Sequence, residues 1–213
     1  MNLRVKNKLV LGLTGSMLSG KSTALNFFAQ NGAAVLSADE IVRELYRVPE
    51  VQQQLSAWFG SFQPARVAAA VFNNKAARRK LEDYLHPLVL KAAAKQIQQS
   101  ANNFFVFEVP LLFESGWDKL TDLNILILGD KRTLSARLQE RGITQAEYNR
   151  RIAAQLPEDE KARRADIVIA NCAGKTDLNL KIKEDLCHTL CTLSPFPQAI
   201  PRHEPRRYAP CGE

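Results

Sequence analysis

The sequence predicts an α/β protein built on a parallel β-sheet, and three observations support this fold class. Five short apolar segments of strand type alternate with longer segments of helical type along the 213 residues. The first strand segment is followed by a glycine-rich loop and then by a helix. The fourth, at 123–129, is a continuous apolar run, which is typical of a parallel strand buried on both faces. Because parallel strands are joined by right-handed crossovers, we expect a doubly wound sandwich of three layers.

The expected elements follow from apolar runs and turn signals in chain order. Strands are expected at about 9–13, 33–38, 104–109, 123–129 and 167–171. A helix at 21–31 ends at the turn signal Asn31-Gly32, a second covers about 40–46, and the last covers 177–193.

The loop after the first strand has the spacing of a phosphate-binding loop. Residues 15–22 read GSMLSGKS, which is GxxxxGK[ST] between a strand and a helix. Glycines let successive backbone N–H groups approach a phosphate at the positive end of a helix dipole, and a lysine adds charge. The predicted nucleotide-binding residues are Gly15, Ser16, Met17, Leu18, Ser19, Gly20, Lys21, Ser22 and Thr23. The fold class is therefore a three-layer P-loop NTPase sandwich with a five-stranded parallel sheet.

Acidic residues stand at the ends of the next two predicted strands. Ligands of open α/β sheets bind outside the carboxyl ends of the strands, so we expect Asp39 to face the same crevice as Gly15. An N-cap of the following helix is the alternative role for Asp39. Glu108 ends the third strand, as does the Walker B carboxylate that serves Mg²⁺ or its water shell in many P-loop proteins. Ser22 offers a hard hydroxyl ligand for the same ion.

Two helical stretches interrupt the alternation of strands and helices. Residues 49–100 are longer than a simple crossover and predict an acceptor-binding insertion, in which Pro87 is expected to end or restart a helix. The stretch at about 131–165 predicts a lid made of a helical pair, 130–142 and 144–166, although a charged helix is also typical of a solvated face. Its arginines include Arg137, Arg141, Arg150, Arg151, Arg163 and Arg164. The predicted organisation is one domain over 1–193, with its core at 1–48, 101–130 and 166–193, and a proline-rich basic tail at 194–213.

Composition limits the partners and the location. The net charge of +7 and the pI near 9.4 indicate an anionic partner, either a polyphosphorylated small molecule or a nucleic acid. No apolar run has the length of a membrane span, and the first residues lack a signal-peptide pattern. We therefore expect a cytoplasmic protein without a membrane partner, whose four cysteines are free thiols. No oligomeric state follows from the sequence.

Taken in order, the motifs resemble the dephospho-coenzyme A kinase family. The resemblance runs through the phosphate loop, SADEIVREL, KLEDYLHP, VFEVPLLFESG, RRIAAQL and RADIVIAN, over nearly the whole chain. It implies transfer of the γ-phosphoryl group of ATP to the ribose 3′-hydroxyl of dephospho-CoA, which is the last step of coenzyme A biosynthesis. ATP and dephospho-CoA are then the substrates, Mg²⁺ is the expected cofactor, and nucleic acid is disfavoured as a partner.

The resemblance also implies roles for individual residues. Asp39 matches the residue proposed to accept the hydroxyl proton, and Lys21 neutralises phosphate oxygens with the help of Mg²⁺ held by Ser22 and, through water, by Glu108. The remaining matches are Arg141 and Arg151 as catalytic lid arginines, Asn171 near the ATP base, and Arg43, His86 and Glu108 beside the acceptor.

The sequence departs from the family at three places. The family loop is usually GGIGSGKS, whereas Ser16, Met17 and Leu18 stand here, so binding should survive unless Ser16 needs a positive φ. The family usually has Asp where Glu108 stands, and the stretch between Gly60 and Val71 is shorter. Two alternatives stay open: another P-loop small-molecule kinase, or an ATP-binding regulatory or nucleic-acid-binding protein that has lost phosphotransfer.

Overall fold

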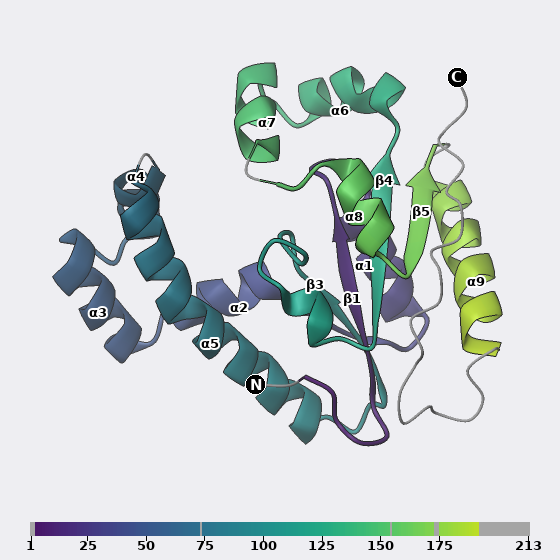
Figure 1. Cartoon of the computed structure of the whole chain (residues 1–213), viewed down its shortest axis with the longest axis horizontal. Helices are drawn as coiled ribbons and strands as arrows, with labels where there is room; N and C mark the ends of the chain where they lie inside the picture. The colour runs from purple at the N-terminus through teal and green to yellow at the C-terminus, as the bar shows by residue number, and fades with distance from the viewer. Residues whose placement is uncertain (1–2, 73, 154, 173–174, 192–213) are drawn as a thin grey trace. The chain divides into compact units, whose positions relative to one another are not determined.

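The computed structural model describes residues 3–72, 74–153, 155–172 and 175–191 (Figure 1). The chain divides into two compact units. A helical unit comprises Met1–Leu3 and Leu36–Ala101, and a sheet unit comprises Arg4–Val35 and Asn102–Glu213.

A five-stranded parallel sheet confirms the predicted fold class. The strands are β1 (Leu9–Gly15), β2 (Ala34–Ser37), β3 (Phe104–Glu108), β4 (Leu123–Gly129) and β5 (Ile167–Asn171). Their order is β2-β3-β1-β4-β5, so β1 is the central strand. Leu13 of β1 is in register with Glu108 of β3, and Gly15 is in register with Ile127 of β4. The phosphate loop therefore leaves the middle of the carboxyl edge.

Helices cover both faces of the sheet. On one face, Phe28 of α1 (Lys21–Gln30) and Ile182 of α9 (Lys175–Cys191) pack with Ile125 and Ile127 of β4. On the other face, α8 (Glu158–Arg164) packs near Leu126 and the neighbouring Leu128. Alternate residues of β4 thus face opposite layers, as the pleat requires, and the three-layer arrangement is confirmed (Figure 1).

The helical unit has a core of its own. Its helices are α2 (Ala38–Leu45), α3 (Pro49–Phe59), α4 (Pro64–Phe72) and α5 (Lys75–Gln99). Val51, Leu55, Val67 and Leu85 are buried together. Partly buried side chains pack around them, among them Val42 of α2 and Tyr84 of α5. Each helix of the unit therefore buries one apolar face against another helix.

The expectation that Pro87 ends or restarts a helix is wrong. The 25-residue helix α5 passes through Pro87 without a break. Proline removes one backbone donor and costs about 3 kcal/mol inside a helix. Leu85 and Val89, on either side of Pro87, are both buried, so packing of the helix outweighs this local cost.

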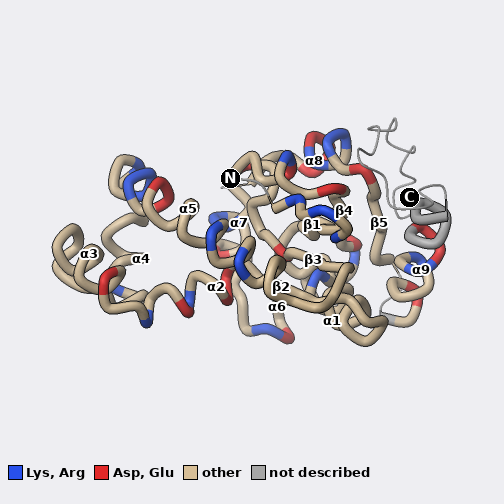
Figure 2. The backbone as a smooth tube through the Cα atoms, turned by 90° about the horizontal axis from the view of Figure 1, so that it is seen from below, with Lys and Arg blue, Asp and Glu red and all other residues tan. Residues whose placement is uncertain are grey.

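The predicted helical pair of the lid consists of three helices. After α6 (Leu134–Glu140) and α7 (Gln145–Ile152), the expected second helix is interrupted before α8. Pro157 is the N-cap of α8, and a residue that precedes a proline is disfavoured in helical conformation, which explains the break. The first turn of α8 is acidic and its last turn is basic, which suits the helix dipole (Figure 2).

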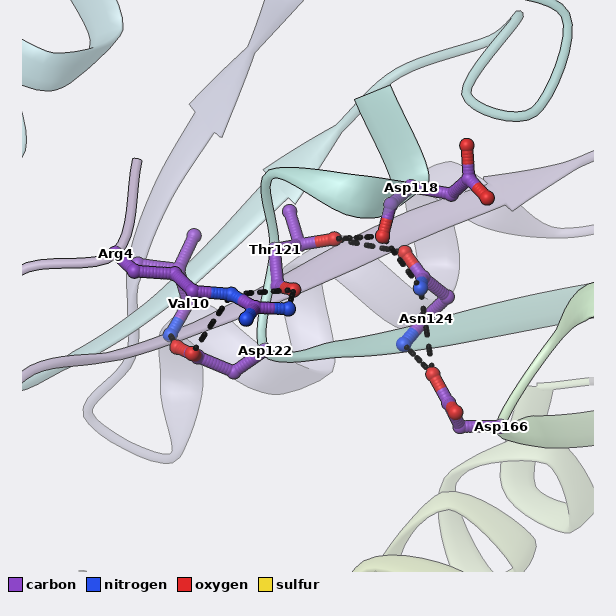
Figure 3. Close-up of polar contacts among 7 residues, drawn as sticks. All are labelled: Arg4, Val10, Asp118, Thr121, Asp122, Asn124 and Asp166. Carbon is purple, nitrogen blue, oxygen red and sulfur yellow. Dashed lines mark hydrogen bonds and ion pairs between the residues drawn. The ribbon is translucent and has the colours of Figure 1, made fainter. Parts of the chain in front are cut away.

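A polar network fixes the amino ends of the strands (Figure 3). The Asn124 side chain donates from Nδ2 to the Asp118 carbonyl at 3.0 Å and accepts at Oδ1 from the Thr121 hydroxyl at 2.8 Å. Its backbone N–H donates to Asp166 Oδ2 at 2.7 Å. A side chain at Gly12 would bring its Cβ to 2.8 Å from Asn124 Oδ1. The close packing of Asn124 against β1 therefore leaves no room for a side chain at this position. These hydrogen bonds therefore connect the residues at the amino ends of the strands, at the edge of the sheet opposite the phosphate loop.

Asp122 anchors the start of β1 within the same group of residues. Its Oδ2 accepts the Val10 N–H at 2.8 Å, and Arg4 lies 3.5 Å from its other oxygen (Figure 3). Burial raises the pKa of Asp122, against the opposing effects of Val10 and Arg4.

Two further expectations concern cysteines and membranes. Cys172, directly after β5, is disulfide-bonded, so the expectation of a free thiol is wrong for this residue. That expectation rested on an inferred compartment, and the sequence holds no information on distances between sulfur atoms. Within the described ranges, no helix combines the length and the hydropathy that a membrane span needs.

Candidate active site

The phosphate loop connects β1 to α1 and is held by its own lysine. Lys21 Nζ donates to the carbonyl oxygens of Gly15 at 2.6 Å and Ser16 at 2.9 Å. Among the described residues other than glycine, only Asn7 and Leu18 have a positive φ, and Leu18 has φ +64°. Ser16 therefore does not have a positive φ, whereas Leu18 adopts a left-handed conformation that is uncommon for a residue with a side chain.

Asn171 joins the end of β5 to the phosphate loop. Its Nδ2 donates to the Ser19 carbonyl at 2.9 Å, and the side chain is buried. The backbone at Gly20 passes so close, with φ +106°, that a Cβ there would collide with Asn171 Nδ2. The predicted nucleotide-site residue Asn171 is thus in direct contact with the loop and holds its carboxyl end in shape.

A cavity of about 460 Å³ lies over the loop. Its walls come from the phosphate loop, the end of β4, α6 and the stretch 148–159. The lining residues include Ser16, Met17, Leu18, Asp130, Arg137, Tyr148, Ile152, Gln155 and Glu158. The space is therefore lined by three phosphate-loop residues, one arginine, three carboxylates and several apolar side chains.

Two hydrogen bonds connect the loop to α6 and α8. Arg137 Nη1 donates to the Leu18 carbonyl at 2.9 Å, and the Ser16 hydroxyl donates to Glu158 Oε1 at 2.7 Å. The phosphate loop is therefore hydrogen-bonded both to α6 and to the first residue of α8.

The cavity is electrostatically mixed. Hydrogen bonds from the Arg132 side chain keep the pKa of Asp130 below its usual value, so this carboxylate is ionised near neutral pH. Burial, reinforced by the charge of Glu158, raises the pKa of Tyr148. A cationic guanidinium thus faces fixed carboxylates before any substrate enters.

The two predicted Mg²⁺ ligands fit that ion in chemistry. Ser22 follows Lys21 in the first turn of α1, and Glu108 ends β3 directly beside β1. Both side chains carry hard oxygen donors, and Mg²⁺ is usually held by one or two protein oxygens together with substrate phosphates. Within the described part of the chain, no group of three or more His, Cys, Asp or Glu residues gathers as a metal site.

Asp39, Arg43 and His86 belong to the helical unit. Asp39 lies inside the first turn of α2, whose N-cap is Ser37, so the alternative role of Asp39 as an N-cap is wrong. Arg43 lies one turn further on the same helix. Burial lowers the pKa of His86 on α5, while Glu82 and Asp83 oppose this effect. Their approach to the phosphate loop stays a prediction.

The two predicted lid arginines, Arg141 and Arg151, lie at exposed positions at the end of α6 and on α7. Arg151 on α7 pairs with Glu147 one turn earlier, and Arg141 is the C-cap residue of α6. Both are exposed, and neither is among the described residues that line the cavity. Their catalytic role stays a prediction.

Sequence reasoning missed three residues that the structure brings to the loop and cavity. Arg137 was recognised only as one of several arginines, although its spacing of one helical turn from Arg141 is a usable signal. Glu158 lies within the single helix expected over 144–166, although Pro157 signals that a new helix starts there. Tyr148 gave no signal, because a single tyrosine on a charged helix has no pattern.

Comparisons with known proteins agree on one family. Residues 9–177 match the family model described as dephospho-CoA kinase. The dephospho-CoA kinase of Fusobacterium nucleatum is 31% identical over 191 residues, which cover 85% of this chain and 98% of that protein. The one from Geobacillus kaustophilus is 38% identical over 176 residues, covering 76% and 88%.

Solved structures are similar as well. The crystal structure of TT1252 from Thermus thermophilus is 26% identical with a TM-score of 0.80, covering 87% of this chain and 99% of that one. A dephospho-CoA kinase from Campylobacter jejuni is 22% identical with a TM-score of 0.56, covering 85% and 97%, and it shares the fold.

Proposed function

The chain belongs to the dephospho-CoA kinase family, and we propose how its own residues divide the work of that family's reaction. In this reaction the 3′-oxygen of dephospho-CoA attacks the γ-phosphorus of ATP. The bond between that phosphorus and the β–γ bridging oxygen breaks, and CoA and ADP are released. The reaction is the last step of coenzyme A biosynthesis, and we place it in the cytoplasm.

The phosphate loop is the observation that carries this proposal. Its backbone N–H groups lie between the central strand and the start of α1, with Asn171 bracing the loop. Lys21 is held by carbonyls of the same loop, and it would exchange these for phosphate oxygens when ATP binds. Loose phosphoryl transfer needs mainly such positioning and charge neutralisation.

Ser22 and, through water, Glu108 are the residues that would hold Mg²⁺. When bound, the ion would supply positive charge that neutralises the phosphate oxygens. Asn171 is also the residue that we assign to the neighbourhood of the ATP base.

The acceptor side is assigned to the helical unit. Asp39 accepts the proton of the 3′-hydroxyl as the new bond forms, and Arg43 and His86 bind dephospho-CoA. Arg141 and Arg151 approach the transferring group from the lid, where guanidinium groups stabilise the spread negative charge.

An assay of ADP release tests the reaction. The enzyme is given ATP and Mg²⁺ with dephospho-CoA, and in parallel with adenosine, AMP or gluconate as acceptor. We expect turnover with dephospho-CoA alone, a product heavier by one phosphate, and no turnover in excess EDTA. Turnover with another acceptor would favour a different small-molecule kinase, and ATP binding without any turnover would favour a protein that has lost transfer.

The variant Asp39→Asn tests the proposed base. It should reduce kcat by about 10²-fold, because an amide cannot accept the proton, while the Kd of ATP stays near the wild-type value. Glu40→Gln changes the adjacent exposed carboxylate in the same turn of α2 and serves as the matched control. Equal turnover in both variants and wild type would remove Asp39 from the mechanism.

A further inference from the structure

Lys161 on α8 is a buried cation that the proposed reaction does not use. Its side chain is 1% exposed, the lowest value among the charged residues whose side chains form the described ion pairs. Lysines are almost never fully buried unless they are paired. Burial lowers the pKa of Lys161, and the carboxylates of Glu114 and Glu158 oppose this effect. A buried charge of this kind requires a structural reason.

The contacts of Lys161 converge on one short segment. Its Nζ donates to Gln155 Oε1 at 2.6 Å and lies 3.6 Å from Glu114 Oε1. The same Glu114 oxygen accepts the backbone N–H of Leu156 at 2.7 Å. The pair Lys161–Glu114 therefore holds two consecutive residues, one by its side chain and one by its backbone.

This segment joins the lid to the sheet. Gln155 and Leu156 line the cavity and stand between α7, which carries Arg151, and α8. Leu156 and Ala162 of α8 pack with Leu126 and Leu128 of β4, so this end of the connection is packed against the sheet. Glu158, the first residue of α8, accepts the hydrogen bond from Ser16 in the phosphate loop.

We propose that Lys161 is a positioning residue for phosphoryl transfer. Together with Glu114 it fixes Gln155 and Leu156 at the cavity wall, and so defines where the segment that follows α7 lies relative to the phosphate loop. A buried apolar residue would fill the same space without orienting the two groups. The inference rests on the proposed kinase reaction and extends it to a residue that contacts no substrate.

The variant Lys161→Met keeps an unbranched side chain that is one heavy atom shorter, and it removes the charge. We expect kcat to fall by about 10²-fold, since small misplacements of catalytic groups cost this much. The Kd of ATP should stay within about threefold of wild type, because the interaction lost acts in the transition state. Hydrogen exchange should accelerate at the Leu156 amide and stay unchanged in β4. A variant that keeps the wild-type kcat and the wild-type exchange at Leu156 would overturn the inference.

A double variant separates positioning from folding. Lys161→Met with Glu114→Gln leaves no unpaired buried charge, so stability should recover relative to the single variant. The turnover should stay low, because Gln155 has still lost its donor. Recovery of both stability and kcat would make Lys161 purely structural.

Lys181→Met is the matched control. Lys181 on α9 also pairs with a carboxylate, Asp177, and donates to a carbonyl, that of Ala170. This variant should leave kcat unchanged. If the wild type shows no turnover with dephospho-CoA, the proposed function fails and the role in phosphoryl transfer fails with it, whereas exchange at Leu156 still shows whether Lys161 holds this segment.

Discussion

At Gly20, two different constraints on a residue of the phosphate loop coincide. Its φ of +106° is unfavourable for a residue with a side chain, and its missing Cβ leaves room for Asn171. Gly116 has a comparable positive φ of +72°, but nothing lies within 4 Å of the position of its Cβ. Substitution of Gly116 therefore tests backbone strain alone, whereas substitution of Gly20 adds a collision with the Asn171 side chain.

Gly20→Ala should destabilise the protein more than Gly116→Ala does. The control variant should cost about 1–2 kcal/mol, the strain of a left-handed residue. Gly20→Ala should add the displacement of Asn171 and should weaken ATP binding, whereas the control should not. Urea unfolding and an ATP titration measure the two effects. Equal losses in both variants would show that the contact with Asn171 does not constrain the loop.

At the scale of the element, α5 contains a proline near its middle, which lowers the stability of the helix. Pro87 has no N–H for the helix ladder, yet the helix continues for twelve residues to Gln99 because its neighbours are buried. Pro87→Ala restores this donor and should raise the free energy of unfolding by up to about 3 kcal/mol. Lys91→Ala, one turn further at an exposed position, should change stability by no more than about 0.5 kcal/mol. A loss of stability in Pro87→Ala would instead mean that the packing depends on the proline ring.

At the scale of the whole molecule, the net charge of +7 fits two kinds of anionic partner, which differ in how their interaction with the protein depends on salt. A site for two polyphosphorylated substrates should show a KM for each that rises with ionic strength, while kcat stays constant, because salt screens the attraction. A nucleic-acid-binding protein would bind RNA without ATP, with an affinity that falls steeply with salt. We expect undetectable RNA binding at about 150 mM salt. Kinetics and RNA titrations over a salt series make the comparison.

The parts that the sequence predicts well are those in which local pattern and structure agree. The strands are dense apolar runs, and the phosphate loop is set by the spacing of Gly15, Gly20 and Lys21. The contacts of Glu158 with Ser16 and of Arg137 with Leu18 were not predictable, because they join residues 142 and 119 positions apart. Pro87 misled for the opposite reason, since tertiary packing outweighed a strong local signal.

The hydrogen bond from Asn171 to Ser19 spans 152 positions of the chain and has a consequence for the order of events during synthesis. The glycine-rich loop leaves the ribosome long before Asn171, the last residue of β5, which holds it in place. Contacts so distant in sequence form late, since a long loop must close first. A nascent chain that ends before residue 171 has the loop sequence without its support. The newly made protein should therefore bind ATP tightly only after Asn171 has been synthesised and has reached the loop.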